Sequence, residues 1–232
     1  LGMQCKAYNL TYVNGSVSFE SALFDAKMMI EEDASSILVG GIDETADYTM
    51  SLFKLAGFIK KENESPYSIL ESTTKGVVLS EGATFFVLEN KIKDNTIAEV
   101  LDVEILNKLD VKEIENKIIS FLASNSLKIA DIDAVVLGYN GDVDSDLYYK
   151  NLSNATFAET PQVYYKHLSG EYDTASAFGL WVGTKIIQTQ NIPDIVKLNA
   201  LDKQSYKTIL LYNQRNGIEH SFTLISSCLN IK

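Results

Sequence analysis

Short apolar runs typical of buried strands alternate along this chain with longer segments whose apolar residues recur at helical spacing. Strands are predicted at 36–39, 77–79, 84–88, 100–106, 133–138, 163–165, 206–212 and 220–226. Helices are predicted at 16–32, 43–57, after the capping-box pair Asp110 and Glu113, near Asp144, and at 174–190. Strands that alternate with helices in this way predict the α/β fold class.

The connections carry their own signals. Residues 6–12 alternate loosely and predict a strand that Asn14-Gly15 ends, and Gly40-Gly41 is expected to end the strand at 36–39. The runs 77–79 and 84–88 flank Ser-Glu-Gly and predict a hairpin with a tight turn. The polar stretch 60–74 contains a proline and predicts a surface loop, and residues 213–217 are expected to join a C-terminal strand pair.

Composition excludes several classes of protein. The 232 residues are 46% hydrophobic and 22% charged, which is typical of a globular protein and not of a disordered one. The formal net charge of −11 argues against a nucleic-acid binder, because phosphate contacts need clustered Lys and Arg. No apolar run reaches the ~18 residues that span a bilayer, and no signal peptide is recognised. Cys5 and Cys228 are too few and too far apart for a disulfide or zinc framework, so we expect a reduced, cytoplasmic protein.

Local motifs give little chemistry. The phosphate-loop, dinucleotide, nucleophile-elbow and zinc-protease motifs are missing from the sequence, so no cofactor and no metal are predicted. Asp142, Asp144 and Asp146 have the spacing at which a calcium loop begins. The glycine and glutamate that such a loop needs later are missing, so a solvated helix start is the preferred interpretation. His167 and His220 are the only histidines, and we do not expect them to form a catalytic pair.

Five longer motifs, taken in chain order, resemble those of a known family. They are a strand and Gly at 10–15 (LTYVNG), an apolar strand at 36–41 (SILVGG), the segment 76–89 (GVVLSEGATFFVLE), an Asp after a loop at Asp146, and a Lys-containing segment at 166–170 (KHLSG) before a helix rich in small residues. Their order and spacing resemble the β-ketoacyl synthases of the thiolase-like fold. The resemblance implies a layered α/β/α/β/α fold whose first half is incomplete at its N-terminus.

The resemblance also locates the family's catalytic positions, and the residues there differ. The nucleophilic Cys position falls at Tyr12, the two His positions fall at Gly138 and Glu171, and the family's Lys is retained as Lys166. A phenol with a pKa of about 10 is mostly protonated at neutral pH. Glycine has no group to stabilise an oxyanion, and a carboxylate would repel it. The family's C-terminal glycine-rich loop is replaced by the sequence NQRNG at 213–217. Together these departures predict a lost active site.

Relatives that lack the catalytic Cys suggest a function. The chain resembles chain-length-factor subunits, which pair with an active ketosynthase in fatty acid, polyketide or aryl-polyene synthesis and shape its acyl tunnel. The resemblance implies an active ketosynthase or a second copy as partner, together with an acyl carrier protein. Two alternatives stay open: a purely structural paralogue, and an active acyltransferase with a displaced site, for which Cys5 is the nearby thiol. Tyr12 is expected to plug the pocket or to be a core aromatic, and in either case its truncation to Ala would cost about 3 kcal/mol.

The same comparison divides the chain. Residues 1–95 correspond to the remainder of the family's first half, and residues 96–232 correspond to a complete second half. The strands at 36–39, 77–79 and 84–88 would then lack neighbours, and bare strand edges are rarely left uncovered. We therefore expect a preceding segment to complete the first sheet and a partner to cover it. The alternative is a shortened fold that closes its edge differently.

Overall fold

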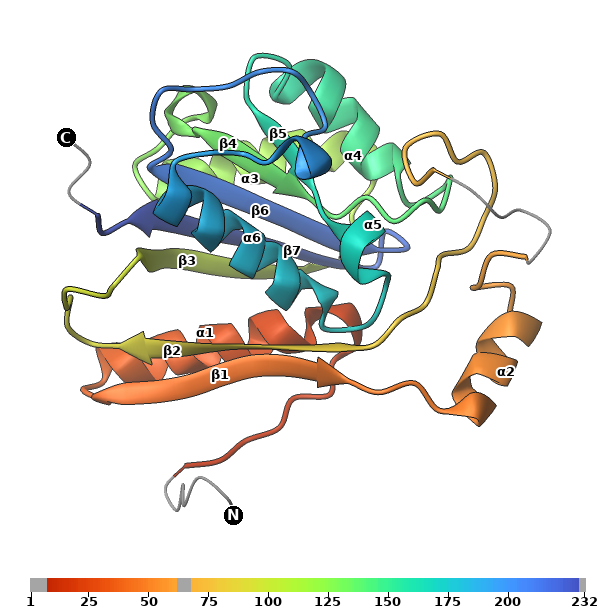
Figure 1. Ribbon diagram of the computed structural model, residues 1–232, viewed down its shortest axis with the longest axis horizontal. Helices are drawn as coiled ribbons and strands as arrows, with labels where there is room; N and C mark the ends of the chain where they lie inside the picture. The colour runs from red at the N-terminus through yellow and green to blue at the C-terminus, as the bar shows by residue number, and fades with distance from the viewer. Residues whose placement is uncertain (1–7, 62–67, 230–232) are drawn as a thin grey trace.

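The computed structural model describes residues 8–61 and 68–229, and in it two β-sheets enclose a layer of helices (Figure 1). The strands are β1 (Ser36–Asp43), β2 (Gly82–Glu89), β3 (Ala98–Asn107), β4 (Ala134–Leu137), β5 (Gln162–Tyr164), β6 (Thr208–Arg215) and β7 (Glu219–Ser227). The α-helices are α1 (Ser18–Glu31), α2 (Asp47–Leu55), α3 (Ile114–Ser124), α4 (Leu147–Asn151), α5 (Lys166–Ser169) and α6 (Ala175–Thr189). Short 3₁₀ turns lie at Gly15–Val17, Val111–Glu113, Ile129–Asp131 and Asp194–Val196, and a π-helical turn at Leu152–Thr156 extends α4.

The larger sheet has the strand order β3-β7-β6-β4-β5. β4 runs parallel to β5 and β6, whereas β7 is antiparallel to both of its neighbours. The predicted C-terminal strand pair is confirmed as the β6–β7 hairpin, although Asn213, Gln214 and Arg215 belong to β6 and not to the turn. The predicted helices at 16–32 and 174–190 are confirmed as α1 and α6, and the Asp110–Glu113 capping box precedes α3. The α/β class is therefore confirmed.

Both faces of this sheet are covered, as the unbroken apolar runs of its central strands require, because successive side chains point to opposite faces. Val135 and Leu210 point to a core shared with Ile118 and Phe121 of α3. Side chains that point to the opposite face, such as Val136, belong to a second core together with residues from α1 and α6. Figure 1 shows α1 and α6 between the two sheets and α3 and α4 on the far side of the larger one. The result is a layered α/β arrangement, as predicted.

The smaller sheet contains only β1 and β2 among the described residues, paired antiparallel from Ser36–Glu89 to Asp43–Gly82. The predicted hairpin of 77–79 with 84–88 is therefore wrong. Val77 instead forms an isolated bridge with Ile59, and Leu79 forms one with Glu171. Sequence proximity favoured the hairpin, but β2 pairs with a strand about forty residues earlier, because its inward side chains Phe86 and Leu88 must pack on the core beneath α1.

Two glycines lie inside β1, where the sequence predicted a stop. A Cβ on Gly40 would lie 2.3 Å from Cδ1 of Phe85, and a Cβ on Gly41 would lie 2.3 Å from Cβ of Thr174. Glycine in a strand often marks such a close approach of neighbouring groups. The strand therefore continues to Asp43, whose carboxylate accepts a hydrogen bond from the backbone N–H of Thr174 (3.0 Å).

Other local predictions need correction. Residues 8–14 are irregular and mostly exposed, because no described strand pairs with them, while 6 and 7 lie outside the described ranges. α2 is shorter than the predicted 43–57 because Asp43 and its predecessors belong to β1, and α4 begins at Leu147. The segment 60–74 is not wholly a surface loop, since Lys60 and Ile69 are buried; residues 62–67 lie outside the description. In the described part of the chain, no helix is long and apolar enough to cross a bilayer.

Candidate functional site

The carboxyl ends of β4 and β5 bring three of the predicted site positions together. Gly138 follows the last residue of β4, and its N–H donates to the carbonyl of Tyr212 on β6 (3.2 Å). Lys166 opens α5 just after β5, and Glu171 follows the end of that helix. Parallel strands place their carboxyl ends at one edge of a sheet, which is where α/β proteins commonly build their sites.

Four buried side chains form what we call the Lys166 network: Asn140, Lys166, Glu171 and Asn213. The Lys166 ammonium donates to both Glu171 oxygens (2.8 and 2.9 Å) and to Oδ1 of Asn213 (3.0 Å). Asn140 Nδ2 donates to Glu171 Oε2 (2.7 Å). The side chains of Lys166 and Glu171 are only 2% and 8% exposed. All three ammonium protons are therefore committed, and the pair is neutral as a unit.

Gly138 borders this network and leaves no space for a side chain. A Cβ there would lie 2.6 Å from Asn213 Oδ1 and 2.7 Å from the Tyr149 hydroxyl. Both atoms already make hydrogen bonds, Asn213 with Lys166 and Tyr149 with the backbone N–H of Gln214 (2.9 Å). The volume that a side chain at 138 would need is therefore filled by neighbouring polar groups.

The segment 76–80 holds the Glu171 loop in place. Glu171 N–H donates to the carbonyl of Val78 (2.8 Å), and Ser80 N–H donates to the carbonyl of Glu171 (3.0 Å). Gly170 adopts φ +69°, and a Cβ there would lie 2.4 Å from Cβ of Ser80. The motif that most strongly suggested the family thus positions Glu171 and does not form the predicted hairpin.

The acidic run beside the site stabilises its own loop. Asp146 is buried and accepts hydrogen bonds from the N–H groups of Asn140 (3.1 Å) and Gly141 (3.0 Å). Burial raises the pKa of Asp146 to about 6, although those two hydrogen bonds oppose the shift. Asp142 accepts from Ser145 N–H (2.9 Å), and Asp144 forms an exposed ion pair with Lys75 (2.7 Å). Within the described ranges, no group of three or more His, Cys, Asp or Glu side chains could hold a metal ion.

The two histidines lie apart from the network. His220 is fully buried on β7, and its Nδ1 is 3.1 Å from the Tyr212 hydroxyl. His167 stacks on Tyr164, with ring centroids 4.0 Å apart. Burial lowers the pKa of both rings. Cys228 is half-buried near the end of the chain, and Cys5 lies outside the described residues.

Tyr12 is not brought to the network. It lies half-buried on the irregular segment 8–14, where it interacts with Tyr8 and with Asp25 of α1. Removal from water and the hydrogen bond to Asp25 raise the pKa of Tyr12 to about 12. Tyr12 is therefore not the core aromatic that one alternative expected. It also lies outside the cavity lining described below.

The segment instead meets the network at the turn that precedes α1. Gly15 has φ +55°, and Ser16 accepts a long hydrogen bond from Asn213 Nδ2 through its backbone carbonyl (3.4 Å). Ser16 N–H donates to Glu219 Oε2 (2.7 Å). Sequence reasoning missed this contact because Asn213 was assigned to a turn. Continuing the predicted strand 206–212 past residue 212 would have placed Asn213 on the strand and indicated this contact.

Truncation of Tyr12 to Ala should therefore cost little. We expect the free energy of unfolding to fall by about 1 kcal/mol, since the side chain is half-exposed. Tyr206→Ala is the matched control, because Tyr206 is fully buried and its loss should cost about 3–5 kcal/mol. Urea denaturation of both variants measures the difference. Equal losses would show that Tyr12 is part of the core after all.

Comparison with solved structures identifies the fold, whereas comparison with family models and curated proteins finds no match. No protein-family model and no curated protein matches the chain. A β-ketoacyl synthase from Burkholderia phymatum STM815 superposes with a TM-score of 0.71 at 17% identity, covering 93% of this chain and 60% of that chain. The AntDE:AntF structure, a type II polyketide synthase acyl-carrier protein in complex with its ketosynthase, gives a TM-score of 0.72 at 18% identity, with coverage of 92% and 61%.

A further match includes a chain-length factor. The structure of the ketosynthase ApeO with its chain length factor ApeC, from Xenorhabdus doucetiae, gives a TM-score of 0.69 at 15% identity and covers 94% of this chain and 60% of that one. The chain thus spans about 60% of the length of these three structures. At these identities the likeness shows the fold alone. The described chain has the thiolase-like fold of the β-ketoacyl synthases.

Proposed function

We propose that this chain is a non-catalytic subunit of the chain-length-factor type, which pairs with an active ketosynthase in fatty acid, polyketide or aryl-polyene synthesis. The observation that carries the proposal is the closed Lys166 network. Glu171 stands at a position where the resemblance expects a catalytic His, and its charge is neutralised by Lys166 at 2.8 Å. A condensing enzyme needs donors aimed at a developing oxyanion. In the Lys166 network, by contrast, the Lys166 and Asn140 donors already bond to Glu171 and Asn213.

Gly138 supports the same function. This other His position carries no side chain, and the space around it is filled by Asn213 and Tyr149. The assignment of the nucleophile position to Tyr12 stays a prediction, as does the division of the chain after residue 95. Chemically, the site has buried charge and hydrogen bonds that hold the loop after β4, the α5 segment and β6 together, which suits an architectural role better than acyl transfer.

The proposal makes a prediction about activity. The isolated protein should neither decarboxylate a malonyl carrier thioester nor condense it with an acyl group. The alternative function is an active acyltransferase whose nucleophile is Cys5, and a second alternative is a purely structural paralogue. The measurement is product formation by the wild type, by Cys5→Ala and by the control Cys228→Ala. Turnover that disappears only in Cys5→Ala would contradict our proposal and would support the active acyltransferase.

An uncovered sheet face supports a partner. The outward side chains of β1 and β2 are Leu38, Ile42, Phe85 and Val87, with exposures of 44%, 69%, 53% and 65%. In the register of the sheet Leu38 lies directly opposite Val87, so these residues form one apolar surface. The larger sheet buries both of its faces. An apolar face of this kind usually marks an interaction site.

We assign this face and the free edges of β1 and β2 to the rest of the functional unit. The occupants that the proposal expects are the segment that completes the first sheet, and a ketosynthase subunit or second copy beside it. The acyl carrier protein is proposed as a further partner, because one of the matched structures contains such a complex. Val87→Lys should abolish assembly with the coexpressed ketosynthase, measured by size-exclusion chromatography with light scattering. Ile195→Lys, equally exposed but on the other half, should leave assembly intact.

A further inference from the structure

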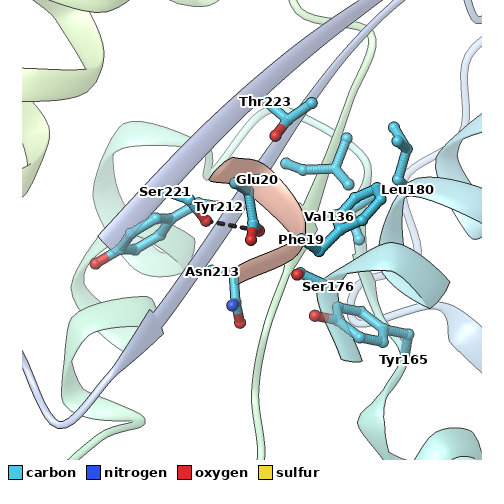
Figure 2. Close-up of a pocket in the computed structure, with 11 residues that line it drawn as sticks. Phe19, Glu20, Val136, Tyr165, Ser176, Leu180, Tyr212, Asn213, Ser221 and Thr223 are labelled. Carbon is cyan, nitrogen blue, oxygen red and sulfur yellow. Dashed lines mark hydrogen bonds between the residues drawn. The ribbon is translucent and has the colours of Figure 1, made fainter. Parts of the chain in front are cut away.

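A small internal cavity lies between α1 and the larger sheet (Figure 2). Its lining comes from α1, β4, β6, β7, the residue after β5, and α6. The volume is about 10 Å³, close to what one water molecule needs. Most of the wall is apolar, so the polar atoms that enter the cavity need an explanation.

Among the described residues, three polar atoms on this wall have no hydrogen-bond partner: Glu20 Oε2, Ser176 Oγ and the Tyr165 hydroxyl. Their residues are 2%, 4% and 2% exposed. They come from three different elements, and Figure 2 shows all three beside the same space. Leaving a buried polar group unsatisfied costs about 1–3 kcal/mol. Three such groups around one space therefore point to a molecule that bonds to all of them.

Glu20 also lacks a partner for its charge. Its Oε1 accepts a hydrogen bond from Ser221 Oγ on β7 (2.9 Å). The neighbouring cation is Lys166, but that ammonium is committed to Glu171 and Asn213. An ionised carboxylate without a partner is costly at this depth, and such a group usually takes up a proton instead.

The groups that face Glu20 from the surrounding elements agree with this. They are Ser176 on α6, Tyr212 on β6, Ser221 on β7, and Tyr165, Lys166 and Glu171 around α5. Burial raises the pKa of Glu20, while the nearby Ser176 and Ser221 hydroxyls and the Lys166 charge oppose the shift. The Lys166 charge is itself paired with Glu171 at 2.8 Å.

We infer that this cavity binds one water molecule, and that Glu20 stands beside it at pH 7 as a neutral carboxylic acid that donates its proton from Oε2 to that water. The water then bonds Ser176 and Tyr165 as well. Three bonds are typical of a buried water. The arrangement satisfies all three orphan atoms and leaves no unpaired charge between α1 and the sheet.

Infrared spectroscopy in D₂O at pH 7 tests the protonation. We expect a carbonyl-stretching band of a protonated carboxylic acid in the wild type and its loss in Glu20→Gln. Glu104→Gln is the matched control, because Glu104 is a partly buried glutamate whose pKa burial also raises, and this variant should keep the band. A wild type without the band would overturn the inference.

The pH dependence of unfolding gives a second readout. The pKa of Glu20 is higher in the folded than in the unfolded chain, so the stability it contributes is complete below the unfolded value. That stability is lost as the pH rises through the folded value. Gln does not titrate, so the melting temperature of the wild type minus that of Glu20→Gln should fall as pH rises. A difference that is constant with pH would contradict the inference.

Crystals test the water. One density peak should lie within hydrogen-bonding distance of Glu20 Oε2, Ser176 Oγ and the Tyr165 hydroxyl. Soaking in rubidium chloride should leave no anomalous peak there, whereas a rubidium peak would show that the cavity takes a cation and that Glu20 is charged. If Glu20→Gln does not fold, Tyr165→Phe serves instead: it keeps Glu20 and removes one partner of the water. Its band should persist at a shifted frequency, and an unshifted band would overturn the water bridge.

Discussion

Replacing Lys166 with Met is expected to lower the free energy of unfolding by about 3–5 kcal/mol, because Glu171 is then left as a buried charge without its partner. The loss is much larger than the net contribution of the ion pair. Forming that pair also required both charges to leave water, and this cost cancels much of their attraction. Urea denaturation measures the change, and the slope of the unfolding free energy with urea should stay the same.

The double variant separates the two contributions. In Lys166→Met with Glu171→Gln the buried charge is gone, while the Gln oxygen can still accept the bond from Asn140 Nδ2. The double variant should therefore be more stable than Lys166→Met alone. Lys197→Met is the control, because Lys197 pairs with Asp202 at 2.9 Å on the surface, where a pair contributes less than about 1 kcal/mol. If the effects of Lys166→Met and Glu171→Gln simply add, the two side chains are not coupled, and the network is not what holds the site.

Local sequence patterns predicted those parts of the fold that local interactions determine. α1 and α6 follow from apolar residues at helical spacing, and the β6–β7 hairpin joins strands that are neighbours in sequence. The pairing of β1 with β2 could not be found in this way. In sequence, α2 and a long connection separate the two strands, and only the shared core beneath α1 brings them together. Gly40 and Gly41 wrongly predicted the end of β1 for the same reason. Phe85 and Thr174, whose close approach requires glycine there, are remote in sequence.

The site shows the same division. Gly138 ends one predicted strand and Lys166 follows another, and the family resemblance assigns both of them and Glu171 to one site, so their convergence could be predicted. Tyr12 lies on a segment whose alternation is loose and with which no described strand pairs, so its register is not fixed, and the chain approaches the network at Gly15 and Ser16 instead. Glu20 was also missed. An acidic residue on an amphipathic helix usually faces solvent, and only the tertiary structure shows that this one is buried against β7.

Replacing Gly138 with Ala is expected to destabilise the protein strongly for a change of one carbon. The new Cβ would lie 2.6 Å from Asn213 Oδ1 and 2.7 Å from the Tyr149 hydroxyl, closer than real Cβ contacts allow. Neither neighbour can retreat, since Asn213 is held by Lys166 and Tyr149 is fully buried. Overpacking of this kind costs about 1–3 kcal/mol. Disturbing the Asn213 contact would add to that, so we expect a loss at or above the upper end. Thermal and urea denaturation measure it.

Gly183→Ala is the matched control. Gly183 lies in α6, and a Cβ there would meet its nearest neighbour at 3.4 Å, an ordinary contact. Alanine favours a helix over glycine by about 1 kcal/mol, so this variant should be as stable as the wild type or more stable. The contrast has a functional consequence. If even one carbon is rejected at position 138, an imidazole cannot be restored there by a single substitution, and the closed site is a property of the packing around it. A Gly138→Ala variant as stable as Gly183→Ala would show instead that the position can accept a side chain, and the case for a non-catalytic site would lose its steric support.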